Sequence, residues 1–159
     1  MTSITGSIPR SRSRPILLVE DNDMDIDLCL RAFEENSIGN PISICRDGDE
    51  AILFIDTHLK PDDPALPLLV LLDLRLSRVD GIEVLRHARQ DPVWKRIPVV
   101  VLTTSREDTD IATAYDLGAN SYIVKPVDFD SFAEVVQQLK MYWILTNVSP
   151  FTTSTEHTG

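Results

Sequence analysis

The sequence predicts an α/β fold built from five β-strand–α-helix units, (βα)5, with a doubly wound parallel sheet. Two observations predict this fold. Short apolar runs without polar alternation recur along the chain, as expected for strands covered by helices on both faces. Segments with helical apolar periodicity separate these runs. A chain of 159 residues, of which 43% are hydrophobic, can bury such a core without disulfides or metals.

The five apolar runs that predict strands cover residues 16–19, 42–45, 68–72, 97–102 and 122–124. An amphipathic helix is predicted after each run, because apolar residues there recur at the spacing of one helix face. In chain order, the apolar residues of the five helices are Leu28, Cys29, Ala32 and Phe33; Ala51, Ile52 and Ile55; Ile82, Leu85 and Ala88; Ile111, Ala112 and Tyr115; and Phe129, Phe132, Val136, Leu139 and Trp143. Gly118 is predicted to end the fourth helix, because glycine favours the backbone conformation that follows many helix ends.

Composition divides the chain into a folded domain, residues 15–145, and two loose ends. Residues 1–14 are rich in Ser, Arg and Pro and predict a disordered arm. Residues 146–159 are rich in Thr and predict a flexible tail, within which Phe151 could dock on the domain.

The charge of the chain argues against nucleic-acid binding. The net charge is −10, from 15 basic and 25 acidic residues. Arg10, Arg12 and Arg14 all lie in the arm, which has no acidic residue, so the rest of the chain carries −13. A domain this acidic repels phosphate backbones, and direct binding to nucleic acid is therefore not expected.

No membrane span, secretory signal or zinc site is expected. The longest apolar stretch, residues 66–72, is only seven residues long, and the N-terminus lacks the apolar core of a signal peptide. Cys29 and Cys45 lie outside any C-x-x-C pattern, which predicts reduced core residues in a cytoplasmic protein. The three histidines are never at metal-ligand spacing.

Polar side chains follow four of the five predicted strands. The carboxyl ends of parallel strands meet at one edge of a doubly wound sheet, and ligands bind there. The residues that we expect at this edge are Glu20 and Asp21 after the first strand, Asp73 after the third, Thr103 after the fourth and Lys125 after the fifth. Three carboxylates, a hydroxyl and an ammonium group should therefore converge.

These side chains predict phosphoryl acceptance. Burying Asp73 after an apolar run would cost several kcal/mol unless its charge is compensated. Crowded carboxylates repel one another, and Mg²⁺ removes that repulsion while keeping several of its waters. A carboxylate can itself be the nucleophile and form an aspartyl-phosphate. Lys125 and the hydroxyl of Thr103 would then interact with the phosphoryl oxygens.

Four segments carry a resemblance to a known family: Glu20-Asp21, residues 73–81 with Asp80-Gly81 at their end, residues 101–105 and residues 122–126. Together they resemble the receiver domain of two-component response regulators over residues 15–144. The resemblance implies a flavodoxin-like architecture with the strand order 2-1-3-4-5. Residues 102–105, 114–118 and 141–143, with the long loop before the third strand, are most similar to the receiver-only regulators of cyanobacterial and bacterial phytochrome histidine kinases.

The resemblance implies that Asp73 accepts a phosphoryl group from a sensor histidine kinase, with phytochromes as the indicated class of kinase. A Mg²⁺ ion, for which Mn²⁺ can substitute, would assist. Its implied ligands are Glu20 (through water), Asp21, Asp73 and the backbone carbonyl of Arg75. Lys125 would pair with the phosphoryl group. The protein would lose this group by intrinsic autodephosphorylation and would not otherwise be an enzyme.

The family also implies a conformational switch. Thr103 would move toward the phosphoryl group, and Tyr122 would change rotamer behind it, remodelling the face formed by the fourth helix, fifth strand and fifth helix. Large apolar side chains such as Tyr142 end the fifth helix, so we expect a homodimer through this face. The bond between Lys125 and Pro126 is expected to be cis.

Two positions depart from the family pattern. Arg75, two residues after Asp73, stands where many relatives have a shorter side chain, and Ser77 stands where Pro is usual. Arg75 lies at the predicted mouth of the site, so we predict that it alters the lifetime of the phosphoryl group, in either direction. Asp25 and Asp27 are interpreted as a solvated helix face.

Other functions fit part of the pattern. A Mg²⁺-dependent phosphatase working through an aspartyl-phosphate would need a second acid where Arg75 stands. A phosphorylation-silent adaptor or phosphate sink would keep the acidic pocket without switching. FMN binding is disfavoured because no Ser/Thr-rich phosphate loop follows the first strand. A stand-alone switch fits best, and its output is expected to be protein–protein contact or onward phosphotransfer, since no output domain is predicted after residue 145.

Overall fold

Strands and helices alternate along the computed structural model, which describes residues 13–151. The elements in chain order are β1 (Ile16–Val19), α1 (Asp23–Glu35), β2 (Ile42–Cys45), α2 (Gly48–Thr57), β3 (Leu69–Leu72), α3 (Gly81–Gln90), η3 (Trp94–Arg96), β4 (Val99–Thr103), α4 (Asp108–Asp116), β5 (Ser121–Val124), α5 (Phe129–Leu139) and η4 (Lys140–Ile144). The strands form one parallel sheet in the order β2-β1-β3-β4-β5, which confirms the predicted fold class and strand order.

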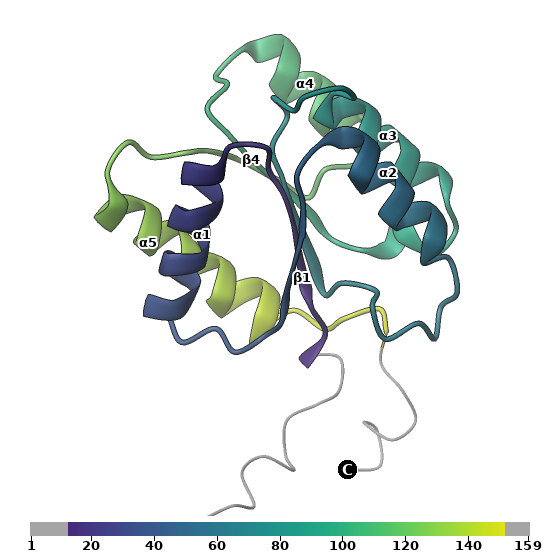
Figure 1. Cartoon of the computed structure of the whole chain (residues 1–159), viewed down its shortest axis with the longest axis horizontal. Helices are drawn as coiled ribbons and strands as arrows, with labels where there is room; N and C mark the ends of the chain where they lie inside the picture. The colour runs from purple at the N-terminus through teal and green to yellow at the C-terminus, as the bar shows by residue number, and fades with distance from the viewer. Residues whose placement is uncertain (1–12, 152–159) are drawn as a thin grey trace, which may run out of the picture.

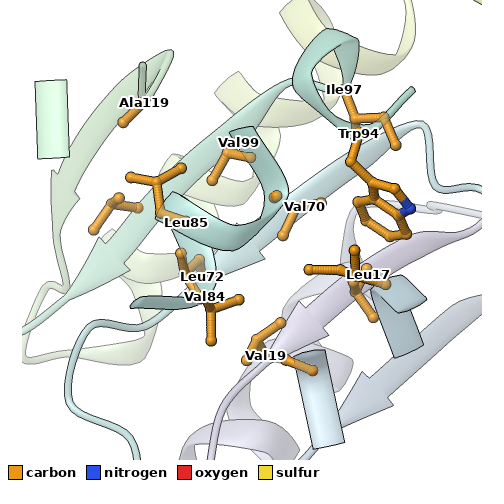
Figure 2. Close-up of a cluster of buried hydrophobic side chains, with 14 of the residues drawn as sticks. Leu17, Val19, Val70, Leu72, Val84, Leu85, Trp94, Ile97, Val99 and Ala119 are labelled. Atoms are coloured by element: carbon orange, nitrogen blue, oxygen red, sulfur yellow. The ribbon is translucent and has the colours of Figure 1, made fainter. Parts of the chain in front are cut away.

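Helices cover both faces of the sheet. In Figure 1, α1 and α5 lie on one side of the strands, and α2, α3 and α4 lie on the other. Successive residues of β1 point to opposite faces, as a strand requires. Leu17 and Val19 pack with α2 and α3, whereas Ile16 and Leu18 pack with α1 and α5. The cluster on the α2–α3 side is drawn in Figure 2. Every residue of β1 is apolar because its side chains pack into the hydrophobic clusters on both faces of the sheet.

Acidic and amide side chains fix where four helices begin. Asn22, Asp47, Asp80 and Asp128 are the N-cap residues of α1, α2, α3 and α5, and each accepts a hydrogen bond from a backbone N–H of the first helical turn. Such a cap contributes about 1 kcal/mol to stability. Each of these four helices follows a strand and the loop after it. The first turns of the helices therefore face the carboxyl edge of the sheet.

The fourth helix departs from the predicted pattern. Its buried residue is Ala114, whereas Ala112 and Tyr115, which we placed on the apolar face with Ile111, are exposed. The prediction was wrong because α4 packs next to β5, the edge strand of the sheet, where little core surface is available. Gly118, which follows this helix, has a φ of +91°, as predicted for a helix stop.

The described end of the chain returns to the core. Phe151 is buried in the cluster on the α2–α3 side, and the guanidinium group of Arg14 lies 4.9 Å from the centre of its ring. In Figure 1, this yellow segment runs from the end of α5 past the start of β1 to the opposite face. Phe151 therefore docks on the domain. Residues 1–12 of the predicted arm and 152–159 of the predicted tail lie outside the described residues.

Within residues 13–151, none of the helices combines the length and the apolar character that crossing a bilayer requires.

Candidate functional site

A lysine surrounded by three carboxylates lies at the carboxyl edge of the sheet. The ammonium group of Lys125 donates to Glu20 Oε1, to Asp25 Oδ2 at 3.0 Å and to Asp73 Oδ2 at 3.1 Å. The side chain of Lys125 is 9% exposed, that of Glu20 2% and that of Asp73 9%. The structure therefore brings together three residues that the sequence placed at three strand ends.

Backbone hydrogen bonds that continue the sheet fix these three positions. The N–H of Glu20 donates to Cys45 O, that of Asp73 to Val19 O and that of Lys125 to the backbone oxygen of the last residue of β4. Each residue therefore extends a strand ladder by one step. A side chain in this position is held by the sheet rather than by a loop, and the site is correspondingly preorganised.

Asp25 is a member of the site that the sequence interpretation missed. We interpreted Asp25 and Asp27 as a solvated face, and this was wrong for Asp25, whereas Asp27 is exposed. The Asn22 side chain caps α1 by accepting a hydrogen bond from the Asp25 N–H at 3.0 Å. This cap places Asp25 in the first turn, directly beside the strand ends. The sequence did contain a signal for Asp25, because this acid lies three residues after the helix cap Asn22 and close to the predicted site.

Asp21 has a different environment from the other acids. Its Oδ2 accepts from the N–H of Ser77 at 3.0 Å and from the hydroxyl of Ser77 at 2.8 Å. Asp21 thus ties the segment after β1 to the segment after β3. The three carboxylates whose oxygens lie within 4.8 Å of one another are instead Glu20, Asp25 and Asp73.

Thr103 ends β4, Tyr122 lies on the neighbouring strand β5, and both side chains contact Ser105. Thr103 is fully buried at the end of β4, and its Oγ1 accepts a long hydrogen bond of 3.4 Å from the Ser105 N–H. The Tyr122 hydroxyl donates to Ser105 O at 3.0 Å, and burial raises the pKa of Tyr122 above its usual value. Both predicted switch residues therefore contact the segment that leads from β4 to α4.

The guanidinium group of Arg75 points away from the cluster of Glu20, Asp25 and Asp73. Its backbone N–H donates to Asp73 Oδ1 at 3.1 Å, but its guanidinium group donates to Asp110 Oδ2 at 2.6 Å. The same group lies 3.4 Å from Ser105 Oγ and 3.8 Å from Glu107 Oε1. Arg75 therefore links the segment after the predicted acceptor to the start of α4.

The electrostatics of the buried cluster favour an added cation. The pKa of Glu20 is raised to about 7, chiefly by burial and also by the negative charge of Asp73, against the opposing effect of the hydrogen bond from Lys125. Burial alone would lower the pKa of Lys125, but hydrogen bonding to Glu20 and the charge of Asp73 outweigh it, so the pKa lies above its usual value. One ammonium group is shared by three carboxyl groups, so their full ionisation would leave two negative charges uncompensated.

This donor set fits a hard divalent cation. Mg²⁺ binds through one or two carboxylates and keeps several waters, and Mn²⁺ also accepts oxygen ligands. The oxygens of Glu20 and Asp73 are close enough to share one ion. Glu20 and Asp73, two of the predicted ligands, therefore fit a divalent cation.

The prediction of a cis peptide bond before Pro126 was wrong. All the described peptide bonds, between residues 13 and 151, are trans, including the one between Lys125 and Pro126. The prediction was wrong in the structure because the trans form is the intrinsic preference of an X–Pro bond, by about 0.5–1 kcal/mol.

The sequence of the chain is similar to those of known response regulators. A profile of the response regulator receiver domain matches residues 16–137. The chain is 44% identical to the probable methanogenesis regulatory protein FilR2 of Methanothrix harundinacea, over 85% of this chain and 86% of that protein. It is 38% identical to the response regulator Rcp1 of Synechocystis, over 85% of this chain and 92% of Rcp1.

Solved structures give the same result. The phosphorylated cyanobacterial phytochrome response regulator RcpA matches with a TM-score of 0.79 and 38% identity, covering 86% of this chain and 98% of RcpA. The Mn²⁺-bound form of Rcp1 matches with a TM-score of 0.77 and 37% identity, covering 86% of this chain and 99% of Rcp1. The predicted resemblance to regulators associated with phytochromes is confirmed, and the chain belongs to the response regulator receiver domain family.

Proposed function

We propose that this chain is a single-domain response regulator that accepts a phosphoryl group on Asp73 from a sensor histidine kinase, with phytochromes as the class of kinase. The observation that carries the proposal is a buried carboxylate at a strand end, with one oxygen on the Lys125 ammonium and the other on the Arg75 N–H. The similarity to RcpA, which has been crystallised in a phosphorylated form, supports it.

The transfer needs a nucleophile and a cation that stay in place. An oxygen of Asp73 attacks the phosphorus of the kinase phosphohistidine; the new P–O bond forms as the P–N bond breaks, and the histidine nitrogen keeps the electron pair. Lys125 is already 3.1 Å from Asp73 Oδ2 and pairs with a phosphoryl oxygen. The Thr103 hydroxyl donates to another oxygen. Tight burial excludes bulk water around the acceptor.

A divalent cation completes the site. Bound Mg²⁺ or Mn²⁺ supplies positive charge that stabilises the oxygens of a transferring phosphoryl group. The residues that would hold it are Glu20, Asp21, Asp73 and the backbone carbonyl of Arg75. In Asp21, Oδ2 accepts both hydrogen bonds from Ser77, so Oδ1 would be the oxygen available to the ion.

The response is a change in the face formed by α4, β5 and α5. The added charge on Asp73 draws Thr103 toward the phosphoryl group and thereby alters its contact with Ser105. Because Tyr122 donates to the same residue, its rotamer changes with that segment. The phosphoryl group is then lost by hydrolysis of the aspartyl-phosphate, without turnover of a separate substrate.

The same face is the proposed contact between two copies of this cytoplasmic regulator. A groove runs between the edge strand β5 and the end of α5, and it is lined by Asn120, Ser121, Ile123, Val135, Gln138, Leu139, Tyr142 and Trp143. Tyr142 and Met141 beside it are about half exposed. A second copy would cover these apolar side chains and the open edge of β5.

Intact-mass measurement tests the proposal. The wild type, incubated with acetyl phosphate and Mg²⁺, should gain the mass of one phosphoryl group, and Asp73→Asn should gain none. EDTA should prevent the gain, and size-exclusion chromatography of the same samples should show a larger species after phosphorylation. Equal phosphorylation of the wild type and Asp73→Asn would refute the assignment of the acceptor. Release of phosphate from the donor over many cycles per chain would indicate a phosphatase instead.

A further inference from the structure

We propose that Asp25 is a positioning residue that holds the Lys125 ammonium from the α1 side and so keeps Glu20 and Asp73 available for other partners. This inference rests on the proposed function and adds a residue from a helix to a site otherwise made by strand ends.

The geometry gives Lys125 one carboxylate for each of its N–H donors. An ammonium group has three donors, and the three carboxylates lie around it. The side chain of Asp25 is 34% exposed, whereas those of Glu20 and Asp73 are nearly buried. Asp25 therefore contacts the ammonium from the more solvent-exposed side of the cluster.

Local structure fixes Asp25 in this position. The Asn22 side chain accepts from the Asp25 N–H at 3.0 Å, and the Asn22 N–H donates to Glu20 Oε2 at 3.2 Å. Glu20, Asn22 and Asp25 thus form one hydrogen-bonded unit around the start of α1. A carboxylate in the first turn of a helix is also favoured by the helix dipole.

Charge sharing gives this contact a function. When Glu20 and Asp73 engage a metal ion or a phosphoryl group, they withdraw from Lys125, and Asp25 is the carboxylate that remains on it. Without Asp25, the ammonium would be shared by Glu20 and Asp73 alone. Its positive charge would then oppose a divalent cation at those two carboxylates. Asp25 therefore favours metal binding without being a ligand.

The α1 helix offers a matched control. Asp25→Asn and Asp27→Asn each remove one negative charge from the same helix, but Asp27 is exposed and lies on the solvent side. Isothermal titration calorimetry should give a Mg²⁺ dissociation constant about fivefold higher for Asp25→Asn, and a change of less than about twofold for Asp27→Asn, because water and salt screen the exposed charge. Circular dichroism would establish that both variants are folded.

A metal-free measurement tests the contact directly. In EDTA, the ¹H–¹⁵N signal of the Lys125 ammonium, assigned by its loss in Lys125→Arg, should be observed in the wild type and in Asp27→Asn. It should be broadened by exchange with water in Asp25→Asn, because the neutral Asn amide holds the ammonium less firmly than a carboxylate does.

The outcomes separate this inference from the proposed function. A wild type that neither binds Mg²⁺ nor gains phosphate would refute the function, while the ammonium signal would still decide the role of Asp25. If Asp25→Asn and Asp27→Asn weaken Mg²⁺ binding equally and both keep the signal, the positioning role is overturned.

Discussion

Two cations with acidic partners lie beside the proposed acceptor Asp73, and they differ in burial. Lys125 contacts Glu20, Asp25 and Asp73 with 9% of its side chain exposed. Arg75 contacts Asp110 at 2.6 Å with 53% of its side chain exposed. The contacts are chemically similar, but the first cluster is in the protein interior and the second is in contact with solvent.

The difference in burial assigns the two clusters different tasks. Removing one partner of a buried ion pair costs about 3–5 kcal/mol, whereas an exposed pair contributes about 0–1 kcal/mol. The Lys125 cluster is therefore a fixed arrangement of buried charged groups in direct contact with one another. The Arg75 contacts can be exchanged at little energetic cost, as expected for a link between the acceptor segment and α4. Substitutions can test this contrast one cluster at a time.

The largest effect is expected for Lys125→Met. Without the ammonium, Glu20 and Asp73 are buried carboxylates with no cation between them, and the free energy of unfolding should fall by about 3 kcal/mol at pH 8 in EDTA. Mg²⁺ should restore part of the loss, because it supplies the missing positive charge. Urea unfolding, followed by the fluorescence of the buried Trp94, would measure both values.

Arg75→Met is the matched control for Lys125→Met. It removes an exposed cation next to the same acceptor and should change the free energy of unfolding by less than about 1 kcal/mol. Equal losses for the two variants would contradict the contrast between buried and exposed clusters.

The next largest effect concerns pH and Glu20. The pKa of Glu20 rises from 4.5 to about 7 in the folded protein, so the folded state holds a proton that the unfolded state releases over this range. The stability from this group is complete below pH 4.5 and is lost as pH rises through about 7. In EDTA, the free energy of unfolding of the wild type should therefore fall between these pH values.

Glu20→Gln should remove this part of the pH dependence and stabilise the metal-free protein at pH 8, because no carboxylate is left to ionise at that position. Unfolding by urea at several pH values would measure the slope. A slope unchanged by Glu20→Gln would show that another group causes it.

The strand ends were predictable from sequence because the sheet imposes them. Apolar runs fix where the strands stop, and parallel strands bring their carboxyl ends to one edge. Glu20, Asp73 and Lys125 therefore converge as the sequence predicted, and Thr103 is buried at the end of the neighbouring strand β4. For these residues, a position in the chain determines a position in space.

The side chains contributed by helices and loops were not predictable in the same way. Asp25 and Asp27 are both acidic residues of α1, and only the orientation of the helix on the sheet separates the one that contacts Lys125 from the exposed one. Likewise, the direction of the Arg75 guanidinium depends on where α4 begins and on Asp110 there. Such contacts depend on tertiary packing, which a single sequence pattern does not encode.

A smaller effect is expected for Ser77→Ala, which removes an uncharged partner of an acid at the same edge. The Ser77 hydroxyl donates to Asp21 at 2.8 Å, and the N–H of the same residue keeps a second hydrogen bond in the variant. The free energy of unfolding should fall by about 0.5–1 kcal/mol. Urea unfolding would measure this loss, and one as large as that of Lys125→Met would mean that hydrogen bonding, rather than buried charge, dominates the site.

The smallest effect is expected for the exposed pair between Arg75 and Asp110. A double-mutant cycle of Arg75→Asn and Asp110→Asn should give a coupling free energy of about 0.5 kcal/mol in urea unfolding, and added salt should reduce it. The contacts of Arg75 with Asp110 and Glu107 hold the start of α4 beside the segment after Asp73, so removing them should let water approach the site more easily. We therefore expect phosphorylated Arg75→Asn to lose its phosphoryl group about twofold faster, which corresponds to about 0.4 kcal/mol in the barrier to hydrolysis. Intact-mass measurements over time would give the rate. An unchanged rate would restrict Arg75 to the link with α4, and a slower one would mean that its guanidinium attracts water instead of shielding the acceptor.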